Sequence, residues 1–399
     1  MTRSVEGVLV VAAVTTFSIM FSIAVVGPLL GELADAESIP LGSAPNTTIG
    51  VIFSLGGLTL ALAQVPVALA ADRYGRRRFI FLGSLVVAVS VAGIGYAGSL
   101  AELLGLRGLS LPLGWDGSTL LLALLRVIQG LGAAATWPIM MALLSVIVPE
   151  ELLGTAMGVF GASFGLGMSL GPVLGPALAT MDIHLPFTVA GILGVVAAGS
   201  ALLLPEARAR VVRRRRRRIL IAPDLLALSI VAFTLLYTMA SLVVIYPRYM
   251  IKMLGLGMSD VAIAMAFAGL TYTLLQPATG KLADKLDKKL LIVPGLPVAG
   301  ISALAAIVSA SPALVYMSML FFGLAGALVF PAASSLVGIR APEGMEGAYM
   351  GFYNAMLSLG VTVSPIIVGL LSDTLGYLIA FSTPLILSAI AAAMVALSV

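Results

Sequence analysis

The sequence predicts an all-α membrane protein with twelve transmembrane helices in two six-helix pseudo-repeat halves. Composition gives the first reason: of 399 residues, 60% are hydrophobic and only 10% are charged. A soluble domain carries roughly 25% charged residues and could not keep so much apolar surface from water. The second reason is a series of long apolar runs, and the third is a repeat that relates the two halves of the chain.

The apolar runs have the length that a bilayer requires, about 20 residues for each helix. We expect the helices of the first half over 8–31, 48–70, 79–99, 118–147, 154–178 and 186–204. Those of the second half are expected over 220–246, 260–280, 290–310, 312–337, 346–371 and 376–397. The fourth run is long for one straight helix, and Pro138 is expected to kink it because proline lacks the backbone N–H group.

A repeat divides the chain into two halves that need each other. The stretch from Leu120 to Pro176 returns 193 positions later without a gap, so that Gly130 corresponds to Gly323 and Gly167 to Gly360. Internal repeats of this kind are typical of transporters whose substrate site lies between the repeats. We predict an N-terminal half over 1–205, a cytoplasmic polybasic linker over 206–218 and a C-terminal half over 219–399.

The basic residues predict the orientation in the membrane. Of the 22 lysines and arginines, 18 fall on one face of the predicted topology, and three fall on the other. The positive-inside rule places the face rich in basic residues in the cytoplasm. We therefore expect a multi-pass protein of the cell membrane with both termini cytoplasmic. The consecutive arginines Arg213 to Arg218 are expected to rest on anionic lipid headgroups; nucleic-acid binding is the alternative, and nothing else in the chain supports it.

A basic loop follows the second span and is repeated in the second half. It contains Asp72, Arg73, Gly75, Arg76 and Arg77, and its counterpart contains Asp284, Lys285 and Lys288. The loop resembles the signature loop of the major facilitator superfamily, although Ala68 stands where that family usually has glycine. The resemblance implies the major facilitator fold. It also implies that Asp72 contacts the start of the eleventh span and holds the cytoplasmic side shut.

A single arginine, Arg126, lies well inside a predicted span. A charge there costs at least about 2.5 kcal/mol, so it should face a cavity or a partner. Helical spacing places Gln129 and Trp137 on the same face, and the whole run resembles the fourth-helix motif of the superfamily. The repeat puts Met319 at the equivalent position, which favours a functional role for the charge. The alternative is that Arg126 only ties helices together.

Glycines four residues apart mark the fifth span. Gly167, Gly171, Pro172 and Gly175 allow close helix approach and a bend. The run resembles the fifth-helix motif of the drug/proton antiporter branch, except that Pro176 replaces its last glycine. Small-residue packing without a transport role is the alternative.

Aromatic and amide side chains complete a predicted substrate cavity, because they lie in spans that line the superfamily's central cavity. With Arg126 and Gln129, the candidates are Phe17, Phe21, Trp137, Tyr237, Tyr272, Gln276, Tyr349, Tyr353 and Asn354. None of the 18 acidic residues lies in the central part of a span, so the proton carrier of an antiporter is unidentified.

These features together predict a secondary active transporter that works by alternating access. We expect a monomeric exporter of amphiphilic organic compounds or drugs, with protons as the candidate coupling ion. The alternatives are a transporter of a small organic anion or other metabolite and, in another class, a non-transporting membrane receptor or scaffold. An enzyme is not expected because no nucleophile–base pair appears. No cofactor or metal is expected, since the chain has no cysteine and one histidine.

Overall fold

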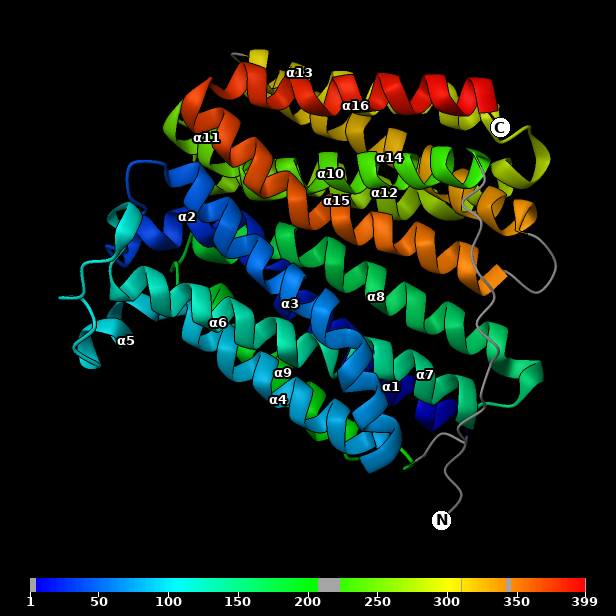
Figure 1. Cartoon of the computed structure of the whole chain (residues 1–399), viewed down its shortest axis with the longest axis horizontal. Coiled ribbons are helices and arrows are strands. Elements are labelled where there is room, and N and C mark those ends of the chain that lie inside the picture. The colour runs from blue at the N-terminus through cyan, green and yellow to red at the C-terminus, as the bar shows by residue number, and fades with distance from the viewer. Residues whose placement is uncertain (1–4, 207–222, 310, 342–345, 399) are drawn as a thin grey trace. The chain divides into compact units, whose positions relative to one another are not determined.

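The computed structural model describes residues 5–206, 223–309, 311–341 and 346–398, which are almost entirely helical (Figure 1). Of these residues, eleven helical segments are long and apolar enough to cross a membrane, and Leu185–Ala201 is a shorter apolar helix. The all-α membrane class predicted by composition is confirmed. Residues 207–222 lie outside the described part, so the polybasic linker stays a prediction.

The chain forms two compact units. Unit 1 comprises Met1–Ser43 and Leu55–Arg213, and unit 2 comprises Ala44–Ser54 and Arg214–Val399. The helices of unit 1 are α1 Val5–Ala24, α2 Val26–Ala36, α4 Arg76–Gly95, α5 Ala97–Leu103, α6 Gly117–Ala134, α7 Trp137–Ile147, α8 Glu150–Ala179 and α9 Leu185–Ala201, with a short 3-10 turn η1 Pro112–Gly114. Those of unit 2 are α10 Pro223–Val244, α11 Tyr246–Lys252, α12 Met258–Lys285, α13 Lys289–Val308, α14 Pro312–Arg340, α15 Glu346–Thr374 and α16 Tyr377–Ser398.

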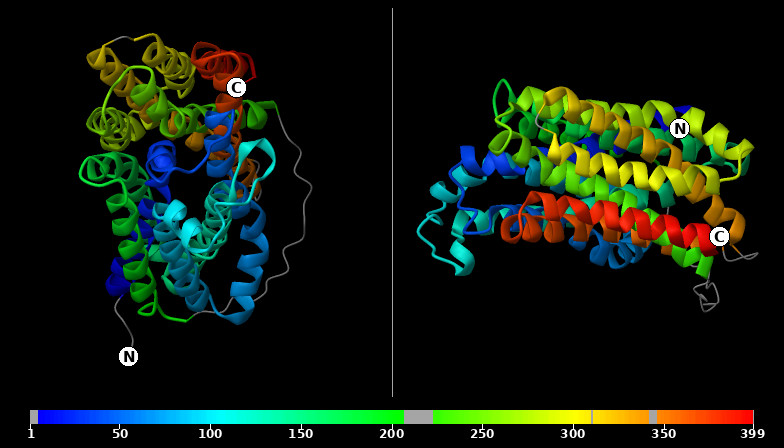
Figure 2. Two further views of the ribbon diagram at one scale, coloured as in Figure 1. Left: turned by 90° about the vertical axis from the view of Figure 1, so that its left-hand side faces the viewer. Right: turned by 90° about the horizontal axis from the view of Figure 1, so that it is seen from above.

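One helix contributes to both units. Helix α3, Pro45–Tyr74, is continuous, yet its first turns up to Ser54 group with unit 2 and the rest groups with unit 1. Figure 2 shows the helices from two further directions.

The two units repeat the same pairs of packed helices. In unit 1, α1 packs on α8 and α4 packs on α9; in unit 2, α10 packs on α15 and α13 packs on α16. Likewise α4 packs on α6 as α13 packs on α14. The correspondence follows the order of the predicted repeat.

Three predicted spans are interrupted shortly before a proline. The first span breaks at Val25, before Pro28, and the fourth breaks after Ala134, before Pro138. The seventh breaks at Ile245, before Pro247. Proline cannot donate to the helical hydrogen-bond ladder, and its ring clashes with the carbonyl four residues earlier. The kink expected from Pro138 appears as an interruption of the helix, and the other two breaks also lie shortly before a proline.

Candidate substrate and gating sites

Close packing between helices is made by glycine at equivalent places in the two units. A Cβ added to Gly167 would lie 2.7 Å from Phe17 O and 2.9 Å from Phe21 N. A Cβ added to Gly360 would lie 2.4 Å from Phe233 O and 3.0 Å from Tyr237 N. Each glycine therefore packs against the backbone of two aromatic residues four apart, on α1 in unit 1 and on α10 in unit 2.

The other glycines of the fifth-span motif continue this contact. A Cβ added to Gly171 would lie 2.8 Å from Ala24 Cβ, and one added to Gly175 would lie 2.8 Å from Val25 Cγ2. Helix α8 runs on without interruption through Pro172 and Pro176. The glycines thus bring α8 against α1 and the start of α2, while a functional bend stays a prediction.

Arg126 and Gln129 form a buried polar pair on α6. Their exposed fractions are 3% and 1%. The guanidinium donates a short hydrogen bond to Gln129 Oε1, and Gln129 Nε2 donates to Ser22 O at 3.3 Å. Gln129 therefore joins the charge on α6 to the backbone of α1, one residue after Phe21.

Glycine on α3 provides the space for that charge. A Cβ added to Gly56 would lie 2.9 Å from Arg126 Nη2, and a Cβ added to Gly130 would lie 2.3 Å from Gly56 O. In unit 2 the corresponding contact joins Gly323 to Ala268, where an added Cβ would lie 2.4 Å from Ala268 O. The two units thus share the helix contact. Unit 1, which contains the buried arginine, has glycine at position 56, whereas unit 2 has alanine at the corresponding position 268.

Trp137 begins α7, beyond the break in the fourth span, and is half-buried. It therefore does not continue the helical face of Arg126. Its ring packs edge-on against Phe164 with the centroids 5.5 Å apart.

The remaining candidates lie in unit 2 and differ in their surroundings. Tyr237 is buried, and its hydroxyl lies 3.0 Å from Thr383 Oγ1. Tyr272 hydrogen-bonds Gln276 one turn later. Tyr353 is also buried, and among the described residues its hydroxyl has no hydrogen-bond partner. Tyr349 is buried on the same helix, whereas Asn354 is exposed.

The predicted gating loop joins α3 to α4. Gly75 has φ +113°, a conformation that glycine adopts without steric cost, and this residue separates the two helices. Arg76 is buried, pairs with Asp72 at 2.8 Å and donates to Ala142 O of α7 at 2.5 Å. Asp72 therefore orients Arg76, whose hydrogen bond to Ala142 O joins α4 to α7.

An acid of the linker also meets this loop. The Arg77 N–H donates to Glu206 Oε1 at 3.4 Å, and the Arg77 guanidinium lies 3.6 Å from Glu206 Oε2. Arg73 is exposed. The expected contact of Asp72 with the start of α15 falls on residues 342–345 and on the undescribed side chains of 346–348, and stays a prediction.

The repeated loop in unit 2 lies between α12 and α13. Asp284 and Lys285 are the last residues of α12, and Lys288 precedes α13. Asp287 Oδ1 accepts from the Lys289 N–H at 3.0 Å, which satisfies an N–H group at the start of α13. The side chain of Asp284 lies outside the described part.

Sequence reasoning missed an acid that caps α3. Asp373, near the end of α15, accepts hydrogen bonds from the N–H groups of Asn46 and Thr47 at 3.3 and 2.7 Å. The Thr47 hydroxyl donates to the same carboxylate at 2.8 Å, and Asn46 Nδ2 donates to Tyr377 OH at 2.9 Å. These contacts lie within unit 2, since the first turns of α3 belong to it. A carboxylate at a helix N-terminus is favourable, but only the fold shows which helix it reaches.

Comparison with known proteins agrees with this architecture. The family model described as Major Facilitator Superfamily matches residues 12–268 and 226–399. An uncharacterised MFS-type transporter of Methanocaldococcus jannaschii is 24% identical over 376 residues, which cover 91% of this chain and 90% of that protein. The quinolone resistance protein NorA of Staphylococcus aureus is 29% identical over 129 residues, 32% of this chain and 33% of its own length.

Among solved structures, a D-xylose-proton symporter is similar in fold. The TM-score is 0.80 at 14% identity, and the match covers 100% of this chain and 98% of that one. The family model and this fold confirm the resemblance that the loop after the second span indicated. The chain belongs to the Major Facilitator Superfamily and is a multi-pass membrane transporter of small molecules, not an enzyme.

Proposed function

We propose that this transporter exports amphiphilic organic compounds by alternating access, in exchange for protons. The buried guanidinium of Arg126 carries the assignment of the site. The repeat shows that packing does not require a charge at this place, because Met319 occupies the equivalent position in α14 and is buried. A charge inside a span is costly and is kept where it serves binding or transport.

Two further observations support the hypothesis that the protein exports amphiphilic organic compounds. The partial similarity to a quinolone resistance protein covers about a third of the chain. The glycines of α8 make the close contact with α1 that the antiporter-like motif requires. We also propose a cell-membrane location with both termini cytoplasmic, on the distribution of basic residues.

The test is transport by purified protein in proteoliposomes. Arg126→Met is expected to insert and fold but to lose transport. Arg126→Lys is expected to recover little of it, because a point ammonium does not reproduce the planar guanidinium fork. Arg340→Met, which removes an exposed charge at the end of α14, is the matched control and should transport as the parent does. Full transport by Arg126→Met would remove this site from the mechanism.

The melting temperature of each variant is followed in parallel. An Arg126→Met protein that cannot be purified folded would indicate that the arginine ties helices together. That outcome would leave the substrate site elsewhere in the family fold.

An organic anion is the second candidate substrate. A buried arginine favours an anion, and no acidic residue lies in the central part of a predicted span to bind a cation. A thermal-shift screen against lipophilic cations, organic anions and sugars separates the candidates, because a ligand that binds the folded state raises its melting temperature. Stabilisation by organic anions alone would replace the export of amphiphilic drugs as the first choice. Failure to move any ligand that stabilises the protein would favour a receptor.

A further inference from the structure

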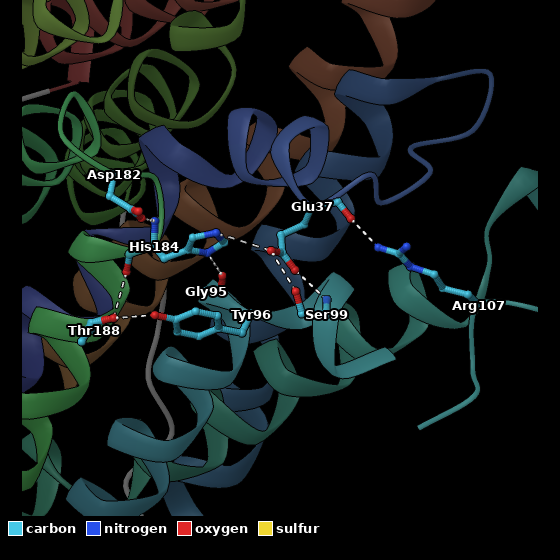
Figure 3. Close-up of polar contacts among 8 residues, drawn as sticks. All are labelled: Glu37, Gly95, Tyr96, Ser99, Arg107, Asp182, His184 and Thr188. Carbon is cyan, nitrogen blue, oxygen red and sulfur yellow. Dashed lines mark hydrogen bonds and ion pairs between the residues drawn. The ribbon is translucent and has the colours of Figure 1, made fainter. Parts of the chain in front are cut away.

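A buried acid and the single histidine of the chain meet at one end of unit 1 (Figure 3). Glu37 directly follows α2 and is 8% exposed, and His184 directly precedes α9. His184 Nε2 lies 3.5 Å from Glu37 Oε1. Glu37 follows α2 and His184 precedes α9, whereas the gating loop joins α3 to α4, so the pair is separate from that loop.

The carboxylate of Glu37 is held by α5. The Ser99 N–H donates to Glu37 Oε2 at 2.6 Å, and the Ser99 hydroxyl donates to Oε1 at 3.2 Å. A Cβ added to Gly98 would lie 2.4 Å from Glu37 O and 2.9 Å from Oε2, so glycine makes room for the acid. The position of the carboxylate is therefore fixed by its surroundings.

The imidazole of His184 is also held on both sides. Nδ1 lies 2.7 Å from Gly95 O, and the ring stacks on Tyr96 with the centroids 4.8 Å apart. The Tyr96 hydroxyl lies 3.1 Å from Thr188 Oγ1, which itself donates to His184 O. A carbonyl oxygen only accepts hydrogen bonds, so Nδ1 must carry the proton.

This tautomer determines what Nε2 offers to Glu37. In the neutral imidazole Nε2 is an acceptor and faces a carboxylate oxygen, which also only accepts. When a proton binds to Nε2, the same contact becomes a charge-assisted hydrogen bond. The flat face of Tyr96 also attracts a cation above it.

Further charged groups lie around the pair. Asp182 Oδ1 accepts a hydrogen bond from the backbone N–H of His184 at 2.7 Å, which adds a second carboxylate beside the histidine. Arg107 Nη2 donates to Glu37 O at 2.9 Å, and the Arg107 guanidinium is itself paired with Glu102 at 3.0 Å. The His184 side chain is 27% exposed, so a proton can arrive from water.

We propose that Glu37 and His184 form a proton-binding site that links the end of α2 to the turn before α9. When one proton binds to His184 Nε2, the two facing acceptors, Nε2 and Glu37 Oε1, become an ion pair. This ion pair stabilises the turn before α9. Imidazole is the side chain that ordinarily changes charge between about pH 5 and 8, and the proposal is tested across that interval. The site is independent of the proposed substrate, and its failure would leave the role of Arg126 untouched.

The single histidine makes a direct test possible. Protein labelled with 15N-histidine, purified without a polyhistidine tag, gives one imidazole spin system. At high pH we expect the neutral tautomer with its proton on Nδ1, and at low pH the imidazolium. A neutral ring protonated on Nε2, or a ring that stays neutral between about pH 5 and 8, would overturn the proposal.

Two variants test the coupling. In Glu37→Gln the ratio of charged to neutral imidazole at one pH is expected to fall about fivefold or more, because the opposite charge is lost. Glu6→Gln removes an exposed acid in the first turn of α1 and should leave that ratio nearly unchanged. Equal ratios in the Glu37→Gln variant and the parent would contradict the ion pair.

A second measurement does not require Glu37→Gln to fold. Melting temperatures of the parent and of His184→Gln are compared between pH 5.5 and 8. In the proposal Glu37 stabilises the protonated form of His184. The ion pair therefore adds to the stability of the folded protein at low pH, and this addition disappears as the imidazole loses its proton at higher pH. The parent should gain stability over His184→Gln on acidification, and an identical pH dependence of the two proteins would overturn the proposal.

Discussion

Gly56 leaves the space that the guanidinium of Arg126 occupies in unit 1. The repeat supports this relation, because Gly56 and Arg126 correspond in sequence to Ala268 and Met319 of unit 2. An alanine at position 56 would overlap the guanidinium, because its Cβ would lie 2.9 Å from Arg126 Nη2. Gly56 is therefore a positioning residue for the charge.

We predict that Gly56→Ala lowers transport and costs about 1–3 kcal/mol of stability, as overpacking typically does. The double variant Gly56→Ala with Arg126→Met reproduces the residue pair of unit 2. It should regain the melting temperature but not transport. Gly199→Ala, at an exposed helical glycine with open space around it, is the matched control. A Gly56→Ala protein with the stability and transport of the parent would contradict the relation.

The spacing of residues in the sequence predicted some of the contacts at these sites, whereas others depend on the tertiary structure. The spacing of three residues between Arg126 and Gln129 predicted a shared helix face, and the structure shows their hydrogen bond. Glu37 follows a helix like many loop acids, and nothing around it in the sequence indicates that Ser99 or His184 covers it. Its burial follows from the folding of unit 1.

The N-terminus of α3 shows how one element depends on a distant one. The first N–H groups of a helix have no partner within it and need a cap. Here Asp373 of α15 accepts two backbone N–H groups and a hydroxyl. The cap is more extensive than one side chain of the helix itself would provide.

We predict that Asp373→Ala destabilises the protein by about 0.5–2 kcal/mol, the usual cost of removing a cap. Asp373→Asn keeps an acceptor and should lose less. Thr374→Ala is the control, since the Thr374 hydroxyl donates to Leu370 O of its own helix. Melting temperatures in detergent measure all three, and equal values for Asp373→Ala and Thr374→Ala would exclude a stabilising cap.

The extents of most elements followed from hydropathy alone. The span predicted over 260–280 is α12, Met258–Lys285, and that over 312–337 is α14, Pro312–Arg340. The breaks at Val25 and Ile245 were not expected, although Pro28 and Pro247 give the same signal as Pro138. Between the third and fourth spans lies α5, Ala97–Leu103, whose first residues fall within the third predicted span, 79–99.

At the scale of the whole molecule, alternating access requires the two sides of the membrane to open in turn. We propose that Asp72 favours closure of the side that carries the basic loops. Its contact with Arg76, which donates to Ala142 O, connects the loop to α7. Removing the charge should favour opening on that side.

We predict that Asp72→Asn lengthens spin-label distances between Leu152→Cys and Leu286→Cys, two exposed positions that the predicted topology puts on the same face of the membrane as the basic loops. Distances between Leu104→Cys and Leu375→Cys, at the other ends of the spans, should shorten. The chain has no native cysteine to interfere with labelling. Arg78→Gln, which neutralises an exposed charge in the same loop, should change neither distance. Unchanged distances in Asp72→Asn would exclude a gating role.

The cap on α3 also constrains the order in which the chain can fold as it is synthesised. Asn46 and Thr47 leave the ribosome early, but Asp373 follows them 327 and 326 residues later. Until α15 is in the membrane, the start of α3 has no carboxylate to accept its N–H groups. An unfinished chain therefore presents an uncapped N-terminus of α3. The cap is completed only when α15 has been synthesised.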